Sequence, residues 1–255
     1  MKVVCLGAGN VASHLTIALK EQAFDIVQVY SRTVQSAALL ANQVGAIPIT
    51  NLKEITDKAD LYIFSLKDSA LESVISQVPK NKGLWIHTAG SIPLNIFSNY
   101  NHRNGVVYPF QTFTKNRKLN WKDIPVFIEA SDEKSLKDIR TMASTLSNKI
   151  FELSSEERKY LHLTGVFACN FTNHMYMLSK LFLQKVNLPF DVALPLIEET
   201  ASKVRDLSPE KAQTGPAVRY DENVIQKHLS LIEDDRIKQI YKLISEDIHK
   251  TNKDI

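Results

Sequence analysis

One stretch of the sequence carries polar side chains where an ordinary helix would not. Residues 161–181 read LHLTGVFACNFTNHMYMLSKL, with two imidazoles and two amides among apolar residues and no charge before Lys180. At about 100° per helical residue, Asn170 and Asn173 lie within roughly 80° of His162. An unpaired buried amide costs roughly 1–3 kcal/mol, so these groups must meet either a second helix or a ligand. We favour a ligand and take His162, Asn170 and Asn173 as candidate catalytic residues.

A second group of residues with defined chemistry lies near the start of the chain. Gly7, Gly9 and Ala12 form a G-x-G-x-x-A pattern between an apolar segment and a helical one. In such a turn the first Gly permits a tight bend, the second lets the backbone approach a pyrophosphate, and the third small residue lets helix and strand pack closely. The free N–H groups of the helix would meet the phosphate charge. The pattern predicts a dinucleotide-binding turn formed by Gly7, Gly9, Asn10, Val11 and Ala12. The alternative is a tight turn without a ligand.

The next predicted strand end indicates which dinucleotide is bound. About 20 residues beyond the glycines, a site for NAD would place Asp or Glu against the ribose hydroxyls. The sequence has Ser31, Arg32 and Thr33 there, with no carboxylate. A guanidinium is always charged and binds phosphate with a planar fork, which suits the 2′-phosphate of NADP. We therefore predict NADP as the cofactor. The alternative for Arg32 is a solvated loop cation.

Polar residues also follow two later predicted strands. In parallel sheets, ligands lie beyond the carboxyl ends of the strands. The first of these ends is therefore predicted to border the cofactor through Ser65, Leu66 and Lys67. The second is followed by the candidate substrate-binding residues His87 and Ser91, although His87 fits a structural histidine at the end of a buried strand equally well.

A last polar group lies in the segment 210–228. Thr214 is followed by Gly-Pro, which predicts a turn because these residues interrupt helices. Arg219 is the one guanidinium of this loop and could bind a carboxylate or a phosphate. Its alternative is an ion pair with Asp221 or Glu222. We take Thr214 and Arg219 as candidate substrate-binding residues.

These groups need a scaffold, and the periodicity of the sequence predicts one. In the first half, short apolar segments alternate with helical segments, as in a parallel sheet covered on both faces. After Ser154 the sequence has no convincing strand, and a helix of about 30 residues could run from there to Val186. We predict an α/β protein in which an N-terminal Rossmann domain (1–153), with a doubly wound and mainly parallel sheet, precedes an all-α C-terminal domain (154–255). Further helices are predicted over 194–207, 221–232 and 234–250.

The composition limits the classes of partner. The chain of 255 residues has a net charge of +3, with 44% hydrophobic and 23% charged residues. Without a long run of Lys or Arg, it lacks the concentrated basic face that nucleic acid requires. No apolar segment approaches the ~20 residues that span a bilayer, and the N-terminus does not resemble a signal peptide. We expect no nucleic-acid or membrane partner, and a cytoplasmic location.

The two cysteines point away from metal binding. Cys5 and Cys169 lie far apart in apolar surroundings, and neither has a CxxC-type neighbour. We therefore expect buried reduced thiols, with no metal site and no disulfide.

Four longer motifs accompany the glycine pattern. They are HTAGS at 87–91, YPFQTF at 108–113, LHLTGVFACNFTNH at 161–174 and QTGPAVRYD at 213–221. Together with the two predicted domains, they resemble the Rossmann-like NADP oxidoreductase group whose C-terminal helical domain is of unknown function. That group lies within the superfamily of 6-phosphogluconate dehydrogenase-like and pyrroline-5-carboxylate reductase-like proteins. The resemblance covers nearly the whole chain. It implies NADP(H)-dependent hydride transfer, a small substrate held between the domains, and a homodimer formed through the helical domain.

The same resemblance reveals a difference at the expected site. Hydroxyacid dehydrogenases of the superfamily place Lys four residues before Asn on the first interdomain helix, whereas here Val166 precedes Asn170 and Cys169 precedes Asn173. Another group must then donate the proton, and His162 is our candidate, with the two amides orienting the substrate. We predict an NADP-dependent oxidoreductase acting on a small carbonyl or imine compound. The alternative is an NADP-binding sensor or regulatory protein without chemistry.

Overall fold

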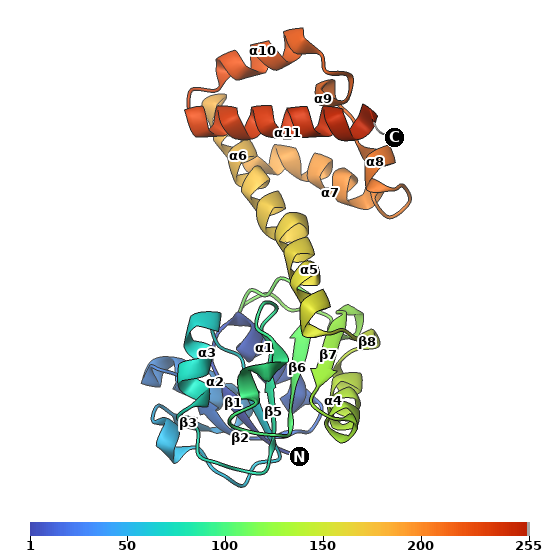
Figure 1. The fold of residues 1–255 in the computed structure, drawn as a ribbon. Helices are drawn as coiled ribbons and strands as arrows, with labels where there is room; N and C mark the ends of the chain where they lie inside the picture. The colour runs from blue at the N-terminus through green and yellow to red at the C-terminus, as the bar shows by residue number, and fades with distance from the viewer. Residues whose placement is uncertain (254–255) are drawn as a thin grey trace. The chain divides into compact units, whose positions relative to one another are not determined.

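The structure is a computed structural model that describes residues 1–253. By its internal contacts the chain divides into two compact units, Met1–Asn173 and the residues from His174 onward. The first unit contains an eight-stranded sheet with the order β3-β2-β1-β4-β5-β6-β7-β8 (Figure 1). Its strands are β1 (Lys2–Leu6), β2 (Asp25–Tyr30), β3 (Ile47–Ile49), β4 (Leu61–Phe64), β5 (Leu84–His87), β6 (Asn104–Pro109), β7 (Val126–Ala130) and β8 (Ile150–Glu152).

The register of the sheet brings several strand ends to one edge. All neighbouring strands run parallel except β6 and β7, which are antiparallel. Leu6 pairs with Phe64, Phe64 with His87, and His87 with Val106, so the carboxyl ends of β1, β4, β5 and β6 are aligned. The chain order reverses between β1 and β4, and ligands of doubly wound sheets bind beyond such a reversal.

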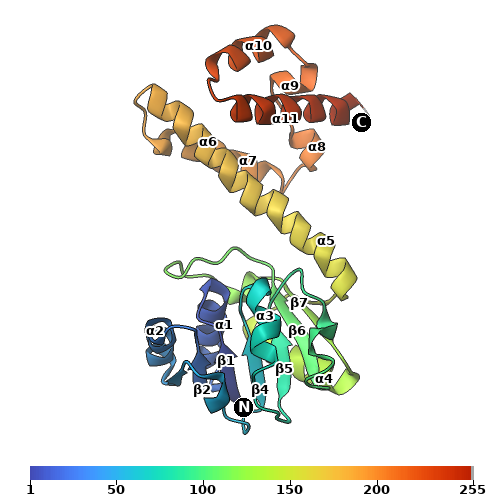
Figure 2. The same ribbon diagram turned by 60° about the vertical axis from the view of Figure 1, so that its left-hand side comes forward.

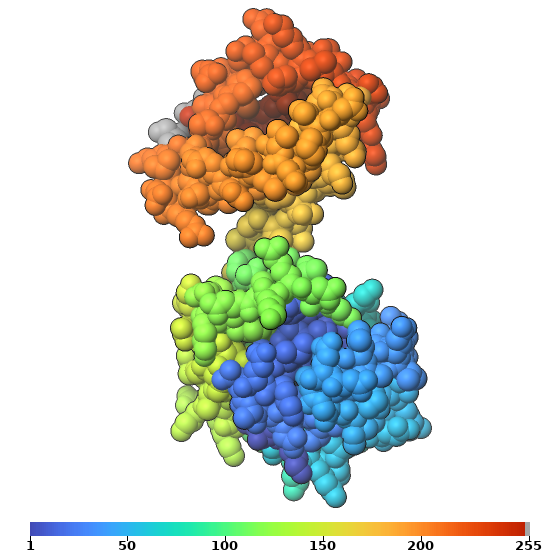
Figure 3. Space-filling model, turned by 180° about the vertical axis from the view of Figure 1, so that it is seen from behind, coloured from blue at the N-terminus to red at the C-terminus, as the bar shows by residue number. Residues whose placement is uncertain are grey.

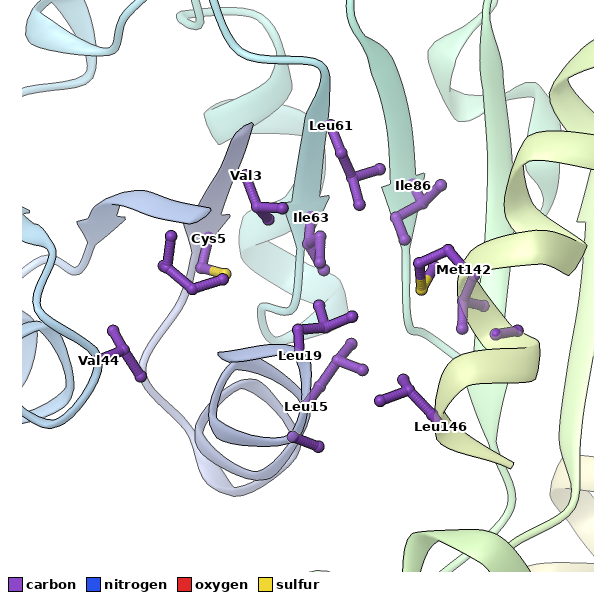
Figure 4. Close-up of a cluster of buried hydrophobic side chains, with 14 of the residues drawn as sticks. Val3, Cys5, Leu15, Leu19, Val44, Leu61, Ile63, Ile86, Met142 and Leu146 are labelled. Atoms are coloured by element: carbon purple, nitrogen blue, oxygen red, sulfur yellow. The ribbon is translucent and has the colours of Figure 1, made fainter. Parts of the chain in front are cut away.

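Helices cover both faces of the sheet. Leu15 of α1 and Met142 of α4 pack with Val3 and Ile86 on one face (Figure 4). Leu71 of α3 belongs to the core on the opposite face. Burial on both faces explains why the strands are almost continuously apolar. The bounds are α1 (Asn10–Glu21), α2 (Val34–Val44), α3 (Asp68–Ile75) and α4 (Glu133–Leu146), with 3₁₀ turns at Leu52–Glu54, Leu94–Phe97 and Trp121–Asp123.

A long helical stretch begins directly after the sheet. Helix α5 (Ser155–Gly165) starts with a capping box, in which the Ser154 hydroxyl accepts from the Glu157 backbone N–H and the Glu157 carboxylate accepts from the Ser154 backbone N–H. This exchange satisfies two backbone donors that would otherwise lack partners. The helix continues as a π-helix over Val166–Phe171 and then as α6 (Thr172–Lys185). The predicted long helix is therefore present, with a wider turn inside it.

The second unit is helical throughout its described residues. Between residues 174 and 252, only Ile225, Ile232 and Ser245 are buried. By contrast, Leu196 is 71% exposed and Leu243 is 70% exposed. Figure 3 shows a hollow in the surface of this unit between its orange and red segments. Its further helices are α7 (Leu194–Lys203), α8 (Pro209–Ala212), α9 (Pro216–Arg219), α10 (Glu222–Leu231) and α11 (Asp235–Lys253), with a 3₁₀ turn at Phe190–Ala193.

The predicted fold class is confirmed, with differences at a few elements. The helix predicted over 194–207 ends at Lys203, and the residues after it form turns before α8 begins at Pro209. Helices α8 and α9 are single turns, too short for periodicity to reveal. The domain boundary between residues 153 and 154 stays a prediction. Within residues 1–253, no helix combines the length and the apolarity needed to cross a membrane.

His87, at the end of β5, gives the fold a dependence on pH. It is fully buried, and burial together with the nearby positive charge of Arg158 lowers its pKa to about 3. In the unfolded chain the pKa is about 6.5, so below that pH the unfolded state binds a proton that the folded state does not. As the pH falls from roughly 6 to 4, we expect this residue to lower the free energy of unfolding by up to about 1.4 kcal/mol for each pH unit.

Urea unfolding of the wild type and His87→Gln across this pH range measures the effect. In the variant, the free energy of unfolding should fall less steeply with falling pH, because the contribution of His87 is absent. This holds whatever the stability of the variant near neutral pH. The exposed His102 provides the control, and His102→Gln should keep the wild-type slope. Equal slopes for the wild type and His87→Gln would contradict the assignment.

Candidate functional site

The turn after β1 has the geometry that a closely approaching phosphate requires. Gly7 has a φ of 126°, and a Cβ added there would clash with the backbone oxygen of Ser65. Gly9 has a φ of −77°, and a Cβ added there would have nothing within 4 Å. Gly7 is therefore required by the backbone itself, because residues with side chains rarely adopt such a φ. Gly9 instead keeps open the surface over which a diphosphate would lie.

Helix α1 begins at this turn with its first amides available to an anion. No side chain caps it, and its first turn has no acidic residue, so the N–H groups from Asn10 to Ala12 carry the positive end of the helix dipole. The Asn10 side chain binds a neighbouring loop, with Nδ2 donating to the Phe113 carbonyl at 2.9 Å. The His14 ring lies 2.9 Å from the Thr114 carbonyl oxygen. Figure 2 shows this loop in green above α1.

The three residues predicted to select NADP lie at the end of β2. Thr33 caps α2, because its hydroxyl accepts from the Ser36 backbone N–H at 3.3 Å. Arg32 is exposed, and none of the ion pairs within residues 1–253 includes it. An unengaged guanidinium beside the N-terminus of α2 gives two sources of positive potential for a phosphate.

A row of contacts leads from the first turn along the edge of the sheet. Gly7 lies against Ser65, which follows β4, and the Ser65 hydroxyl accepts from Thr88 Oγ1 at 3.0 Å. Thr88 follows β5, and two residues later Gly90 lies against the ring of His162. A Cβ added to Gly90 would be 2.5 Å from His162 Nδ1. The ends of β1, β4 and β5 are thus connected to helix α5.

The other two residues predicted after β4 continue this row. Leu66 is half-buried, with Cδ2 3.4 Å from the position of a Cβ on Gly7. Lys67 is exposed at the N-cap of α3. Both therefore lie at the edge where the cofactor is predicted to bind, and their contacts with it stay predictions.

Helix α5 contacts β6 and β7 through three residues on one of its faces. Positions 158, 162 and 165 follow the i, i+4, i+7 spacing that places side chains in one line. The contacts are Arg158 with Glu129 (guanidinium to carboxylate, 2.5 Å), His162 with Tyr108 (Nδ1 to Oη, 3.0 Å) and Gly165 with Phe110 (added Cβ to Cε2, 3.0 Å). Of the polar residues in the stretch 161–181, His162 therefore meets a polar group of the sheet, the Tyr108 hydroxyl.

Arg158 is the most deeply buried of these residues, with 1% of its surface exposed. Besides Glu129, it donates to the Ile92 carbonyl at 2.6 Å and to Ser155 Oγ at 3.2 Å. The Glu129 carboxylate also accepts from the backbone N–H and the hydroxyl of Ser155, at 2.9 and 2.7 Å. The first turn of α5 is thus bound to β7 and to the loop after β5 by charge-assisted hydrogen bonds.

Tyr108 is a candidate functional residue that the sequence analysis did not identify. It is half-buried at the carboxyl end of β6, and its partner His162 is exposed. Burial raises the pKa of the Tyr108 hydroxyl, and the positive charge of Arg158 opposes that rise. The two residues of the pair are 54 positions apart in sequence. Only the motif YPFQTF could have drawn attention to Tyr108.

The two candidate amides lie differently from the expectation. Asn170 and Asn173 were expected to be buried, and both are exposed. The angles that placed them beside His162 assumed a uniform α-helix, whereas Val166–Phe171 is π-helical. Each π turn takes about one more residue than an α turn, so residues after it lag by roughly 100°. This lag still leaves Asn173 within roughly 80° of His162 and brings Asn170 nearer to it, so the shared stripe and the catalytic roles of the two amides stay predictions.

The predicted substrate-binding residues have varied surroundings. His87 has no exposed surface, which disfavours direct contact with a ligand. Ser91 is exposed, and its hydroxyl donates to Asp68 at the start of α3. Thr214 and Arg219 are exposed residues of the second unit, and no ion pair in the described part of the chain includes Arg219. The substrate-binding roles of these residues stay predictions.

Both cysteines are free thiols. Cys5 is buried, and its Sγ accepts from the Thr16 hydroxyl at 3.0 Å. Burial raises the pKa of this thiol to about 12, which disfavours the reactive thiolate. Cys169 is half-buried within the π-helix. Within residues 1–253 there is no group of three or more His, Cys, Asp or Glu side chains arranged to hold a metal ion.

Comparisons with known proteins match both parts of the chain. Residues 2–86 match the family described as NADP oxidoreductase, coenzyme F420-dependent. Residues 124–248 match a domain of unknown function, DUF2520. A crystal structure from Bacteroides fragilis, described as a "putative NADP oxidoreductase", is 50% identical over 98% of both chains, with a TM-score of 0.92. No curated protein matches the sequence.

Two structures of lower identity share the fold. The imine reductase of Myxococcus stipitatus in complex with NADP+ is 11% identical over 100% of this chain and 93% of that chain, with a TM-score of 0.68. The reductive aminase of Aspergillus terreus is 14% identical over 90% of this chain and 77% of that chain, with a TM-score of 0.63. At these identities the likeness concerns the fold alone.

The family agrees with the geometry of the first turn and of the β2 end. An open Gly9, an uncapped α1 and an unengaged Arg32 are what a phosphorylated dinucleotide requires. These matches confirm the predicted cofactor and the predicted enzyme class. They also confirm the resemblance to the NADP oxidoreductase group. The chain belongs to the NADP oxidoreductase family that joins a coenzyme F420-dependent type of NADP oxidoreductase domain to a DUF2520 helical domain, and it is an oxidoreductase that uses NADP.

Proposed function

We propose that the protein reduces a small carbonyl or imine compound and that His162 donates the proton. The coenzyme supplies the hydride, and the residues of the chain supply the proton and the orientation of the substrate. The observation that carries the proposal is the 3.0 Å hydrogen bond between Tyr108 Oη and His162 Nδ1 at the carboxyl edge of the sheet. Sheets of this class bind their ligands at that edge.

The surroundings of His162 suit a proton donor. Tyr108 occupies Nδ1, so Nε2 is the ring nitrogen left for a substrate. When Tyr108 donates to Nδ1, the neutral ring carries its own proton on Nε2. A proton held there can pass to the oxygen or nitrogen that gains negative charge as the hydride arrives. Gly90 supports this arrangement, because a larger residue at that position would displace the ring.

The substrate class rests on the type of bond that the two distant structures reduce. They are described as an imine reductase and a reductive aminase, and this chain shares their fold. We therefore include C=N as well as C=O compounds, with Asn170, Asn173, Ser91, Thr214 and Arg219 as the proposed groups that orient them. NADPH binding without turnover across both classes would favour the alternative, a sensor or regulatory protein.

We further propose that two copies of the chain associate through their helical units. Two leucines on separate helices are largely exposed: Leu196 of α7 at 71% and Leu243 of α11 at 70%. Large contiguous apolar surfaces on a folded chain mark interaction sites, since each fully buried Leu contributes about 1.5–3 kcal/mol. A symmetric dimer is the simplest assembly that covers the same surface on every copy.

The first prediction from this proposal concerns the choice of coenzyme. Arg32→Gln should weaken NADPH binding about 10- to 100-fold, because a hydrogen bond to a charged group contributes roughly 1.5–3 kcal/mol. NADH binding should change little, since NADH has no 2′-phosphate. Fluorescence titration with both coenzymes measures this. The exposed Arg236 of the second unit supplies the control, and Arg236→Gln should change neither affinity. An equal loss for NADPH and NADH would refute the selection of phosphate by Arg32.

The second prediction concerns the proton donor. His162→Ala should lower kcat for NADPH oxidation by about 10²–10⁴-fold, the usual range for loss of a general acid, and leave the Kd of NADPH unchanged. The assay uses a panel of small keto acids and cyclic imines. His174→Ala removes another exposed imidazole, from α6, and should retain wild-type turnover. Undiminished turnover in His162→Ala would remove this residue from the mechanism.

The third prediction concerns assembly. Leu196→Glu combined with Leu243→Glu should convert the dimer to a monomer, because each substitution places a charge where apolar surface would be buried. Sedimentation velocity over a range of concentrations measures the change. Lys242→Glu alters the charge of α11 at an exposed position next to Leu243 and should leave the dimer intact. A monomeric wild type would rule out the proposed dimer.

A further inference from the structure

A buried cation lies beside the proton donor without a role in the proposal above. Arg158 is one helical turn before His162, at a spacing that places the two side chains about 5–6 Å apart at Cβ. In the antiparallel pair β6–β7, Val106 faces Glu129 and Tyr108 faces Phe127. Tyr108 and Glu129 therefore lie on the same face of the sheet, one step apart. Arg158, held by Glu129, thus lies next to the Tyr108–His162 pair.

The positive charge of Arg158 is only partly used by its partners. Glu129 accepts one hydrogen bond from Arg158 and two more from Ser155, so its negative charge is shared among three donors. The Nε–H of Arg158 is buried and has no hydrogen-bond partner in the described residues. His87, the other titratable group facing this cluster, is uncharged near neutral pH, because its pKa is lowered to about 3. Arg158 is therefore a fixed, dehydrated positive charge within the cluster.

We propose that Tyr108 returns the proton that His162 gives to the substrate, and that Arg158 is a positioning residue that stabilises the resulting tyrosinate. This inference rests on the proposed function and names how its proton is supplied. The Tyr108 hydroxyl is hydrogen-bonded to His162 and lies within the field of Arg158, both from α5. Arg158 in turn pairs with Glu129 of β7 and acts on His87 of β5.

The proton and electron balance of the relay is closed. The hydride and its electron pair pass from NADPH to the carbonyl or imine carbon, leaving NADP+. The substrate oxygen or nitrogen takes the proton from His162 Nε2, and His162 Nδ1 takes the proton from Tyr108 Oη. The products are the alcohol or amine, a neutral His162 in its other tautomer, and the tyrosinate form of Tyr108. Water then reprotonates the tyrosinate.

The geometry explains why the relay needs Arg158. A tyrosinate that is half-buried loses part of its hydration, and burial accordingly raises the pKa of Tyr108. The neighbouring guanidinium lowers that pKa, because it attracts the negative form. Arg is suited to this position since it stays charged when buried. Without it, the tyrosinate would be less stable and the transfer of the proton from Tyr108 to His162 less favourable.

The first test replaces Tyr108 with trifluorotyrosine, whose hydroxyl is more acidic. Reduction needs the protonated phenol, so the rate should fall as the pH rises through its pKa. The fluorinated ring should therefore move this alkaline fall in kcat to lower pH. The same replacement at Tyr160, an exposed residue of α5 with 77% of its surface accessible, is the matched control and should not move it. Identical pH profiles for the two replacements would overturn the relay.

Tyr108→Phe gives a second, independent signature. The imidazolium form of a histidine, which forms in acid, carries two protons and can donate without a relay. The variant should therefore keep activity in acid and lose about 10²–10⁴-fold near and above neutral pH, with an unchanged Kd for NADPH. A uniform loss at every pH would mean that Tyr108 only shapes the site, and would count against the relay.

The role of Arg158 is tested in the trifluorotyrosine background. Arg158→Met combined with Glu129→Leu removes both charges, which avoids leaving either one buried alone. Loss of the cation should move the alkaline fall in kcat back to higher pH. The exposed pair Arg140 and Glu152, changed to Met and Leu, is the control and should not move it. A double variant at 158 and 129 that folds and keeps the profile of its background would refute the positioning role.

A readout without turnover separates this inference from the proposed function. The imidazole resonances of His162 can be titrated by NMR in the wild type, in Tyr108→Phe and in the trifluorotyrosine protein. Ionisation of the fluorinated phenol should raise the pKa of His162, because a negative charge then adjoins Nδ1. If no compound of the panel oxidises NADPH, the proposed function fails while this coupling is still measured. An imidazole titration that is the same in all three proteins would show that the pair does not exchange a proton.

Discussion

The attachment of helix α5 to the sheet is the constraint on which the candidate site depends. It rests on the buried pair of Arg158 and Glu129, which are joined at 2.5 Å. Removing one partner of such a pair typically costs about 3–5 kcal/mol, whereas replacing both by apolar residues can cost nothing. The pair therefore fixes the orientation of α5 more than it adds to the free energy of unfolding. A planar guanidinium accepts few orientations of a carboxylate, so it fixes the rotation of α5 about its axis, and with it the position of His162.

Small residues make that attachment close enough for chemistry. Gly90 and Gly165 both lie where a Cβ would meet an aromatic or imidazole ring. The reversal of β7 is equally necessary, because antiparallel pairing with β6 places Glu129 beside Val106, on the face that carries Tyr108. Strand direction, helix rotation and two missing side chains together bring the Tyr108 hydroxyl within 3.0 Å of His162. None of these features would suffice without the others.

Features formed by residues close in sequence could be predicted, whereas features formed by residues far apart in sequence could not. The sheet, its helices and the turn after β1 depend on local patterns, and their secondary structure was predicted correctly. Tyr108 was missed because its partner is 54 residues away. Arg158 was missed because a cation in the first turns of a helix usually faces solvent, and only tertiary structure buries it. The π-helix over Val166–Phe171 was missed because apolar periodicity does not distinguish it from an α-helix, and the angles of Asn170 and Asn173 were therefore derived for a uniform α-helix.

The separation between coenzyme selection and proton supply follows from the order of the strands. The residues predicted to select NADP follow β1 and β2, within the first 33 residues. The proposed proton path comes from β6, β7 and α5. Strands β2 and β6 are four strand spacings apart, which is about 19 Å at about 4.8 Å for each spacing. A dinucleotide lying along the edge would span this distance, with its phosphates at one end and its reacting ring toward the other. In the proposed relay, the strand residue Tyr108 supplies through His162 the proton that the resemblance would assign to a Lys of the helix.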